Sequence, residues 1–166
     1  QGRLEMLMNF QQMIIDLTGM DISNASLLDE STAAAEAMMM AFKIKKSSKF
    51  SFCIQNKCHP QTLSVLKTRA KPLGIKIIFD NITDDTFGCL IQNPDTYGEI
   101  ADLDKLIQHN KDKDIISIIA ADIMSLVVMK SPGNFDADIV VGSSQRFGVP
   151  MGLGGPHAAF FATKDE

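Results

Sequence analysis

The sequence lacks several features that would assign it to whole classes of protein. No apolar run approaches the roughly 20 residues that a bilayer requires, so we expect no membrane-spanning segment. The formal net charge is −4 and the only basic run, residues 43–49, is short and suits a solvated helix end, so nucleic acid is not expected as a partner. The three cysteines, Cys53, Cys58 and Cys89, show no C-x-x-C spacing, which predicts reduced thiols in an intracellular protein.

Common catalytic and metal-binding motifs are missing as well. The chain has no G-x-S-x-G sequence and no His and Glu set at metal-ligand spacing, so we predict no metal site. The stretch GLGGPH, residues 152–157, resembles a dinucleotide-binding fingerprint only loosely, because Pro156 would disrupt the helix that must follow. Cys58 and His59 are adjacent in the sequence, and the side chains of adjacent residues rarely face each other. These two residues are therefore not expected to form a catalytic dyad. The ten methionines are interpreted as core filler.

The chain does contain a concentration of glycine near its end. Five of the eleven glycines fall within GSSQRFGVPMGLGGPH, residues 142–157. Apolar runs at residues 138–141 and 158–162 predict buried strands on either side, so these glycines lie on a loop between two strands. Glycine adopts backbone angles closed to other residues and permits close approach of a ligand or a second backbone. The loop is therefore predicted to shape a site or a tight interface.

Helical and strand patterns alternate along the rest of the chain. Leu7, Phe10, Ile14 and Leu17 follow one helical face, and Gly19 suits the end of that helix. Further helices are predicted at residues 33–42, 60–70 and 102–110, strands at 50–54, 75–79, 89–92 and 115–121, and a polar turn at 21–24. This alternation indicates an α/β fold with a mainly parallel sheet and flanking helices. The length of 166 residues suits a single domain, residues 1–166.

Polar residues that follow the strands are the candidates for a site, because ligands of such sheets lie beyond the carboxyl ends of the strands. Asp122, His59 and residues 143–146, which include Gln145 and Arg146, stand in such positions. We add Ser31 and Thr32, because a helix N-terminus favours an anion. Together these residues would bind an anion and a ring.

Each candidate also has a purely structural interpretation. Ser31 and Thr32 can be helix caps, and His59 can cap the helix that follows it. Asp122 can cap the segment 123–129, and Arg146 can pair with a neighbouring carboxylate. The residues alone leave these alternatives open.

Longer stretches of the sequence carry a resemblance to a known family. Residues 1–37, together with KCHPQT, TRAK and GSSQRFGVPMGLGGPHAAFFATK, resemble the N-terminal half of the glycine cleavage system P-protein, the decarboxylating glycine dehydrogenase. The resemblance runs from the first residue to the last and is loosest over residues 75–114. It implies the large domain of a pyridoxal phosphate (PLP)-dependent transferase of fold type I, like that of aspartate aminotransferase, and truncated.

The resemblance also implies what this half lacks. In the family, the lysine that forms the Schiff base with PLP lies in the C-terminal half, and Gln145 stands at the matching position here. No catalytic residue is therefore expected in this chain, since an amide cannot form the aldimine. Ser31 and Thr32 match a phosphate cup, His59 matches a histidine of the catalytic half, and Asp122 falls near the carboxylate that pairs with the ring nitrogen. Gln145 and Arg146 complete the candidate cofactor-binding set.

The implied function is that of the parent protein. It would decarboxylate glycine with PLP and pass the aminomethyl group to the lipoyl group of the H-protein, while this segment, inactive alone, supports the site of the lysine-bearing half or subunit. The start at Gln1 without a Met and the stop directly after a strand indicate a segment of a larger polypeptide. A homodimer or heterotetramer is expected, in the mitochondrial matrix of a eukaryote or otherwise in the cytoplasm. The alternative is a PLP-independent binding or scaffold protein with the same fold.

Overall fold

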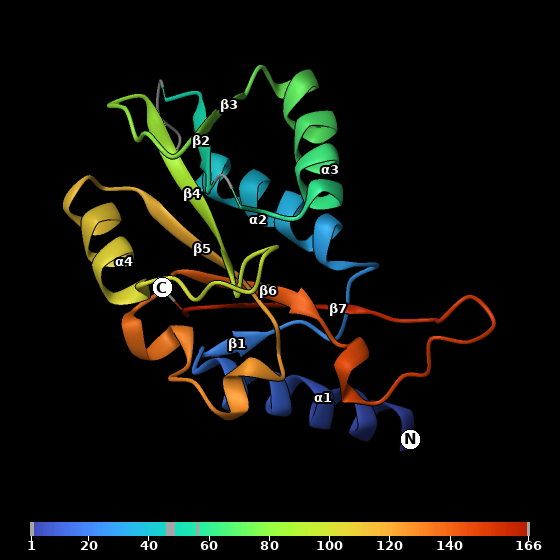
Figure 1. Cartoon of the computed structure of the whole chain (residues 1–166). Helices are drawn as coiled ribbons and strands as arrows, with labels where there is room; N and C mark the ends of the chain where they lie inside the picture. The colour runs from blue at the N-terminus through green and yellow to red at the C-terminus, as the bar shows by residue number, and fades with distance from the viewer. Residues whose placement is uncertain (1, 46–48, 56, 166) are drawn as a thin grey trace.

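The computed structural model describes residues 2–45, 49–55 and 57–165. Its helices are α1 (Gly2–Thr18), α2 (Glu30–Lys45), α3 (Pro60–Ala70) and α4 (Leu103–Asp112). Its strands are β1 (Ile22–Ser23), β2 (Ser51–Ile54), β3 (Lys76–Phe79), β4 (Thr86–Asn93), β5 (Ile116–Ala121), β6 (Ile139–Ser143) and β7 (Ala159–Thr163) (Figure 1). Short 3-10 turns are η1 (Lys71–Leu73), η2 (Ser125–Val127), η3 (Pro132–Phe135) and η4 (Gln145–Phe147).

The strands form one seven-stranded sheet in the order β1-β7-β6-β5-β4-β2-β3. Neighbouring strands from β3 to β6 run parallel, whereas β7 runs antiparallel to β6 and β1 runs antiparallel to β7. The prediction of an α/β fold with a mainly parallel sheet is confirmed.

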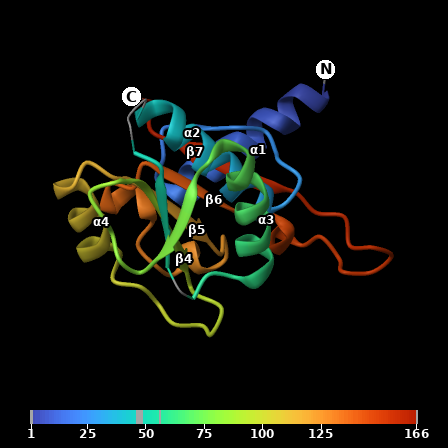
Figure 2. The same ribbon diagram turned by 90° about the horizontal axis from the view of Figure 1, so that it is seen from above.

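Helices cover both faces of the sheet, and each face has its own core. Successive residues of a strand point to opposite faces, so Ile118 and Ala120 of β5 pack beneath α2 and α3, whereas Ile119 and Ala121 join the core with α1 and α4. Figure 2 shows α3 and α4 on opposite sides of β4. Burial on both faces explains why β5 is a continuous apolar run.

Helix α2 lies close to the sheet because its buried face is made of small side chains. Alanine is the strongest helix former, and Ala33, Ala34 and Ala37 have no exposed surface. The predicted caps of this helix are wrong: the backbone N–H of Thr32 donates to Oδ1 of Asp29 at 2.7 Å, so the helix begins at Glu30. Ser31 and Thr32 lie in its first turn.

The other predicted helices and strands agree with the structure, except where their bounds depend on contacts with distant parts of the chain. Helix α1 ends as predicted, with φ of 70° at Gly19, whose N–H donates to the carbonyl of Ile15 at 2.8 Å. The predicted polar turn at residues 21–24 contains β1, because the edge of β7 supplies its hydrogen-bond partner. Strand β4 begins at Thr86, three residues before the predicted start. Residues 46–48 of the basic run lie outside the described residues.

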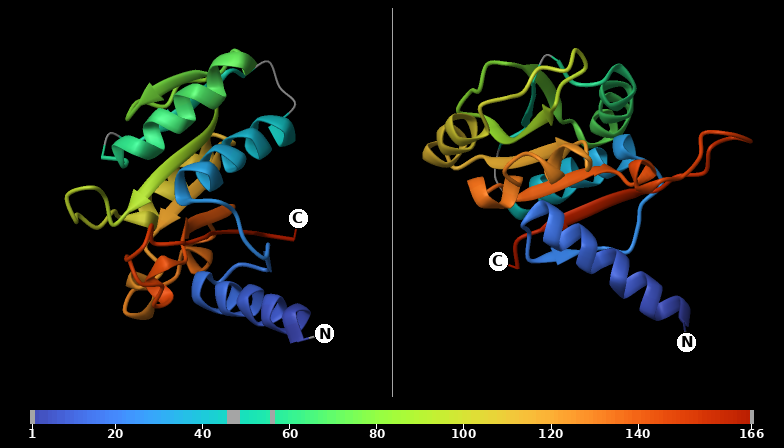
Figure 3. Two further views of the ribbon diagram at one scale, coloured as in Figure 1. Left: turned by 90° about the vertical axis from the view of Figure 1, so that its right-hand side faces the viewer. Right: turned by 60° about the horizontal axis from the view of Figure 1, so that its bottom comes forward.

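The glycine loop joins β6 to β7, as predicted, and its tip extends away from the body of the molecule (Figure 3). The prediction is wrong for Gly142, the first of the five glycines, which lies within β6 because it pairs with Phe160 of β7. Met151 and Leu153 at this tip are exposed by 86% and 107%. Among the residues that the structure describes, no helix combines the length and apolarity needed to cross a bilayer.

Candidate functional site

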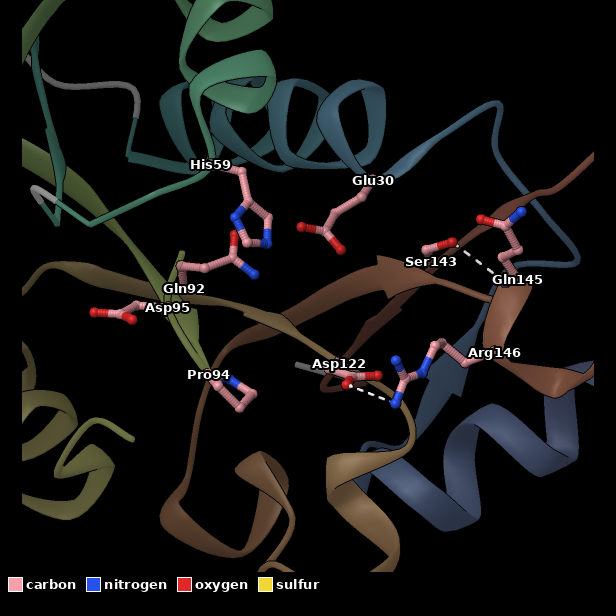
Figure 4. A pocket seen from close by; sticks show the side chains of 9 residues that line it. All are labelled: Glu30, His59, Gln92, Pro94, Asp95, Asp122, Ser143, Gln145 and Arg146. Atoms are coloured by element: carbon pink, nitrogen blue, oxygen red, sulfur yellow. Dashed lines mark hydrogen bonds and ion pairs between the residues drawn. The ribbon is translucent and has the colours of Figure 1, made fainter. Parts of the chain in front are cut away.

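A pocket of about 300 Å³ lies where β4, β5 and β6 end and where α2 and α3 begin (Figure 4). It is lined by Glu30, His59, Gln92, Pro94, Asp95, Asp122, Ser143, Gln145 and Arg146. This is the edge at which a doubly wound sheet places its ligand, because the carboxyl ends of its parallel strands and the N-termini of its helices converge there.

Four of the six predicted site residues meet in this pocket: His59, Asp122, Gln145 and Arg146. Ser31 instead lines a neighbouring hollow of about 320 Å³, which shares Glu30, His59 and Ser143 with the pocket. Of the described residues, Thr32 is not among those that line either space. The pocket thus lies at the carboxyl ends of the strands, where the sequence placed the candidate site. Ser31 lies at the margin of the pocket, and Thr32 lies outside it.

Asp122 makes two structural contacts, although its side chain does not cap the turn η2 that follows. Its Oδ1 accepts the backbone N–H of Met124 at 3.1 Å, which stabilises the turn after β5. Its Oδ2 lies 3.5 Å from Nη2 of Arg146, so the predicted ion pair of Arg146 is present. The guanidinium is more than half exposed, and the pair is therefore screened by solvent.

His59 precedes α3 but does not cap it with its side chain. Its Nδ1 lies 2.9 Å from Oγ1 of Thr96, and that hydroxyl donates to the carbonyl of Lys57 at 2.8 Å. Burial raises the pKa of the neighbouring Cys58 thiol to about 12, which disfavours its thiolate form.

Glu30 and Gln92 are pocket residues that the sequence reasoning missed. Glu30 is the first residue of α2, and burial raises the pKa of its carboxyl above the ordinary value. Gln92 is 4% exposed and donates from Nε2 to the carbonyl of Ala120 at 3.2 Å. Oε1 of Glu30 and Oε1 of Gln92 are buried and have no hydrogen-bond partner. Gln92 could have been found as a polar residue at a strand end. The place of Glu30 in the pocket could be predicted only from the correct start of α2.

Gln145 begins the turn η4 just after β6, and its side chain lines the pocket (Figure 4). Its backbone N–H donates to Oγ of Ser143 at 3.2 Å, which closes the chain tightly at the end of the strand. Gly148 ends the turn with φ of 110°, a conformation that favours glycine. The glycine loop thus presents Gln145 and Arg146 to the pocket.

The pocket does not fit covalently held pyridoxal phosphate. Such a cofactor needs a lysine for its aldehyde and N–H groups or cations for its phosphate. Among the described residues that line the pocket, none is a lysine. At the N-terminus of α2, Asp29 already accepts the N–H of Thr32, and Glu30 adds a second carboxylate. A phosphate would be repelled there. Nor do three His, Cys, Asp or Glu residues gather as metal ligands within the described part of the chain.

Comparison with known proteins decides the family. A family model, "Glycine cleavage system P-protein", matches residues 1–166. The chain belongs to the glycine cleavage system P-protein family. A curated relative, "Glycine dehydrogenase (decarboxylating) 2" of Pseudomonas putida, is 54% identical over 170 residues, which cover 100% of this chain and 18% of the relative. The chain thus spans about a fifth of the length of such relatives.

Solved structures support the same fold. A crystal structure of glycine decarboxylase (P-protein) of the glycine cleavage system in inhibitor-bound form is similar to this chain with a TM-score of 0.93 and 32% identity, over 99% of this chain and 40% of that one. A protein described as an O-acetylhomoserine (thiol)-lyase from Campylobacter jejuni, with pyridoxyl-lysine phosphate in its structure, has a TM-score of 0.74 at 17% identity, over 95% of this chain and 40% of that one. The second likeness shows the fold alone, that of PLP enzymes of fold type I.

Proposed function

We propose that residues 1–166 are one segment of the PLP-transferase-like large domain in the non-lysine half of a P-protein. The whole protein would decarboxylate glycine with PLP and transfer the aminomethyl group to the lipoyl group of the H-protein. The single observation that carries the activity is the family match over the full chain. The location proposed is the cytoplasm for a bacterial source and the mitochondrial matrix for a eukaryotic one.

We infer that this segment supports the active site and does not contain it. The support for this is chemical: Gln145 lines the pocket where the resemblance places the Schiff-base lysine, and the helix N-terminus beside it is acidic. The lysine would therefore lie in another half or subunit, which would assemble with this one as a homodimer or heterotetramer. The exposed tip of the glycine loop, with Met151 and Leu153, is proposed to pack near that interface.

Borohydride trapping tests the proposed location of the lysine. The full-length protein is loaded with PLP, reduced with borohydride and digested, and the pyridoxyl-lysine is mapped by mass spectrometry. We expect one modified lysine per catalytic site, outside residues 1–166. A stoichiometric adduct on a lysine of this segment would contradict the proposal. No adduct anywhere would favour the PLP-independent binding or scaffold alternative.

Substitution of Gln145 tests whether the pocket is complete apart from its nucleophile. We expect Gln145→Lys in the full-length protein to bind no second equivalent of PLP, because Asp29 and Glu30 keep the N-terminus of α2 acidic and therefore unfavourable for a phosphate. Gln108→Lys on the exposed surface of α4 is the matched control. An additional aldimine absorbance band in Gln145→Lys alone would show that the site needs only the lysine.

A further inference from the structure

The pocket presents buried hydrogen-bond acceptors that no described residue satisfies. Oε1 of Glu30 and Oε1 of Gln92 both lack a partner. The Gln92 amide is oriented by its own bond to the sheet, since Nε2 donates to the carbonyl of Ala120. The opposite orientation would bring two oxygens together. Gln92 lines the pocket and is 4% exposed, so its free oxygen is shielded from bulk solvent; in Figure 4 this oxygen lies beside the His59 ring.

His59 adds a third acceptor when its imidazole ring is neutral. The hydroxyl of Thr96 donates to the carbonyl of Lys57, so Oγ1 of Thr96 accepts from Nδ1–H of His59. A neutral imidazole with its proton on Nδ1 has a lone pair on Nε2. His59 also lines the pocket. Three acceptors, from α2, β4 and the start of α3, therefore open onto one space.

We propose that this pocket binds the primary ammonium group of a small amine or amino acid. A primary ammonium has three N–H donors and no acceptor, which matches three acceptors of which one is a carboxylate. The ligand charge also offsets the cost of burying an ionised Glu30. The volume of about 300 Å³ suits a ligand of a few heavy atoms.

Arg146, on the other side of the pocket, would distinguish an amino acid from a simple amine as the ligand. Arg146 is 59% exposed at its side chain and only loosely paired with Asp122, at 3.5 Å. A guanidinium has five N–H donors, so it can bind a ligand carboxylate while keeping that pair. An amino acid would use both sides of the pocket, whereas a simple amine would use only the acceptor side.

Calorimetric titration of the full-length protein tests the proposal, with methylammonium, glycine and tetramethylammonium as probes. The protein is first reduced with borohydride, so that no PLP aldimine elsewhere can exchange with an amine. If no aldimine exists, the reduction changes nothing and the titration still reports on this pocket. We expect saturable binding of methylammonium and glycine but not of tetramethylammonium, which has no N–H donor. Tighter binding of glycine that is lost in Arg146→Ala would identify an amino acid as the preferred ligand, and equal affinities would identify the amine.

Two variants weaken the acceptor side of the pocket without inserting bulk: Glu30→Gln removes the negative charge, and Gln92→Met removes the amide oxygen. Each should weaken methylammonium binding about tenfold or more, as expected when a charge-assisted hydrogen bond to the ammonium group is weakened or lost. Glu36→Gln is the matched control, because Glu36 lies on the same helix but pairs with Arg69 outside the pocket. Thermal unfolding of each variant checks that it is folded. The proposal fails if neither probe binds saturably, if tetramethylammonium binds as tightly as methylammonium, or if Glu30→Gln binds no more weakly than Glu36→Gln.

Discussion

Replacement of Gly142 by alanine should disrupt the sheet next to the pocket, whereas the same change within the loop should not. Gly142 lies in β6 and pairs with Phe160 of β7. A Cβ placed at Gly142 would overlap the carbonyl oxygen of Ala121 and lie 2.5 Å from Cζ of Phe160. The first of these atoms belongs to the backbone of β5 and cannot turn aside, and Phe160 is fully buried.

The size of the effect follows from this overlap. Forcing one additional methyl group into a well-packed core costs about 1–3 kcal/mol. Local stability of that kind is measured by amide hydrogen exchange with mass spectrometry on the full-length protein. At about 1.4 kcal/mol for each tenfold change, peptides from β5, β6 and β7 should exchange about 5 to 150 times faster in Gly142→Ala than in the wild type.

Gly152→Ala is the matched control for this prediction. An added Cβ at Gly152 meets no atom within 4 Å. The amide hydrogen exchange of Gly152→Ala should therefore match that of the wild type. If Gly142→Ala exchanges as slowly as the wild type, or if both variants exchange equally fast, the packing described between β5, β6 and β7 is wrong.

Three further predictions concern α2. Asp29→Ala should destabilise the protein by about 0.5–2 kcal/mol in thermal unfolding through loss of the cap on Thr32, while Asp29→Asn should retain most of the stability. Met38→Ala should cost about 2–5 kcal/mol, because Met38 has no exposed surface, and a smaller loss would indicate that the core relaxes around it. Burial raises the pKa of Glu30, so folding favours the protonated carboxyl. The contribution of this group to the stability of the fold is therefore fully present below the ordinary carboxyl pKa and is lost as the pH rises through the raised pKa. The unfolding temperature of Glu30→Gln should therefore rise relative to that of the ligand-free wild type as the pH increases from about 4 to 8. Parallel plots of unfolding temperature against pH for the two proteins would contradict this.

The fold could be predicted because the chain follows simple periodicities, and the pocket because polar residues follow its strands. His59, Asp122, Gln145 and Arg146 come from four separate positions in the sequence, yet parallel strands bring them to one edge. Strand β1 could not be predicted, since two residues in a polar stretch become a strand only by pairing with β7.

The start of α2 shows why the candidate site was only partly predicted. Asp29, Ser31 and Thr32 are all good N-cap residues, so local sequence does not choose between them. The choice of Asp29 places Glu30 at the pocket and moves Thr32 away from it. In β4, all eight residues are buried, so no alternation of polar and apolar positions marks Gln92, and only its place near the end of the strand could have indicated the pocket.

The pairing of β1 with β7 has a consequence for biosynthesis. Ile22 pairs with Thr163, and the N–H of Asp165 donates to Oδ2 of Asp21, so the first strand meets its partner only when the last one has left the ribosome. At about 5–20 residues per second, this delay is roughly 7 to 30 seconds. During that time one sheet edge has no partner, and α1 has only part of the surface that it will later cover. We expect this edge to be the last part of the segment to fold and the first to engage a chaperone.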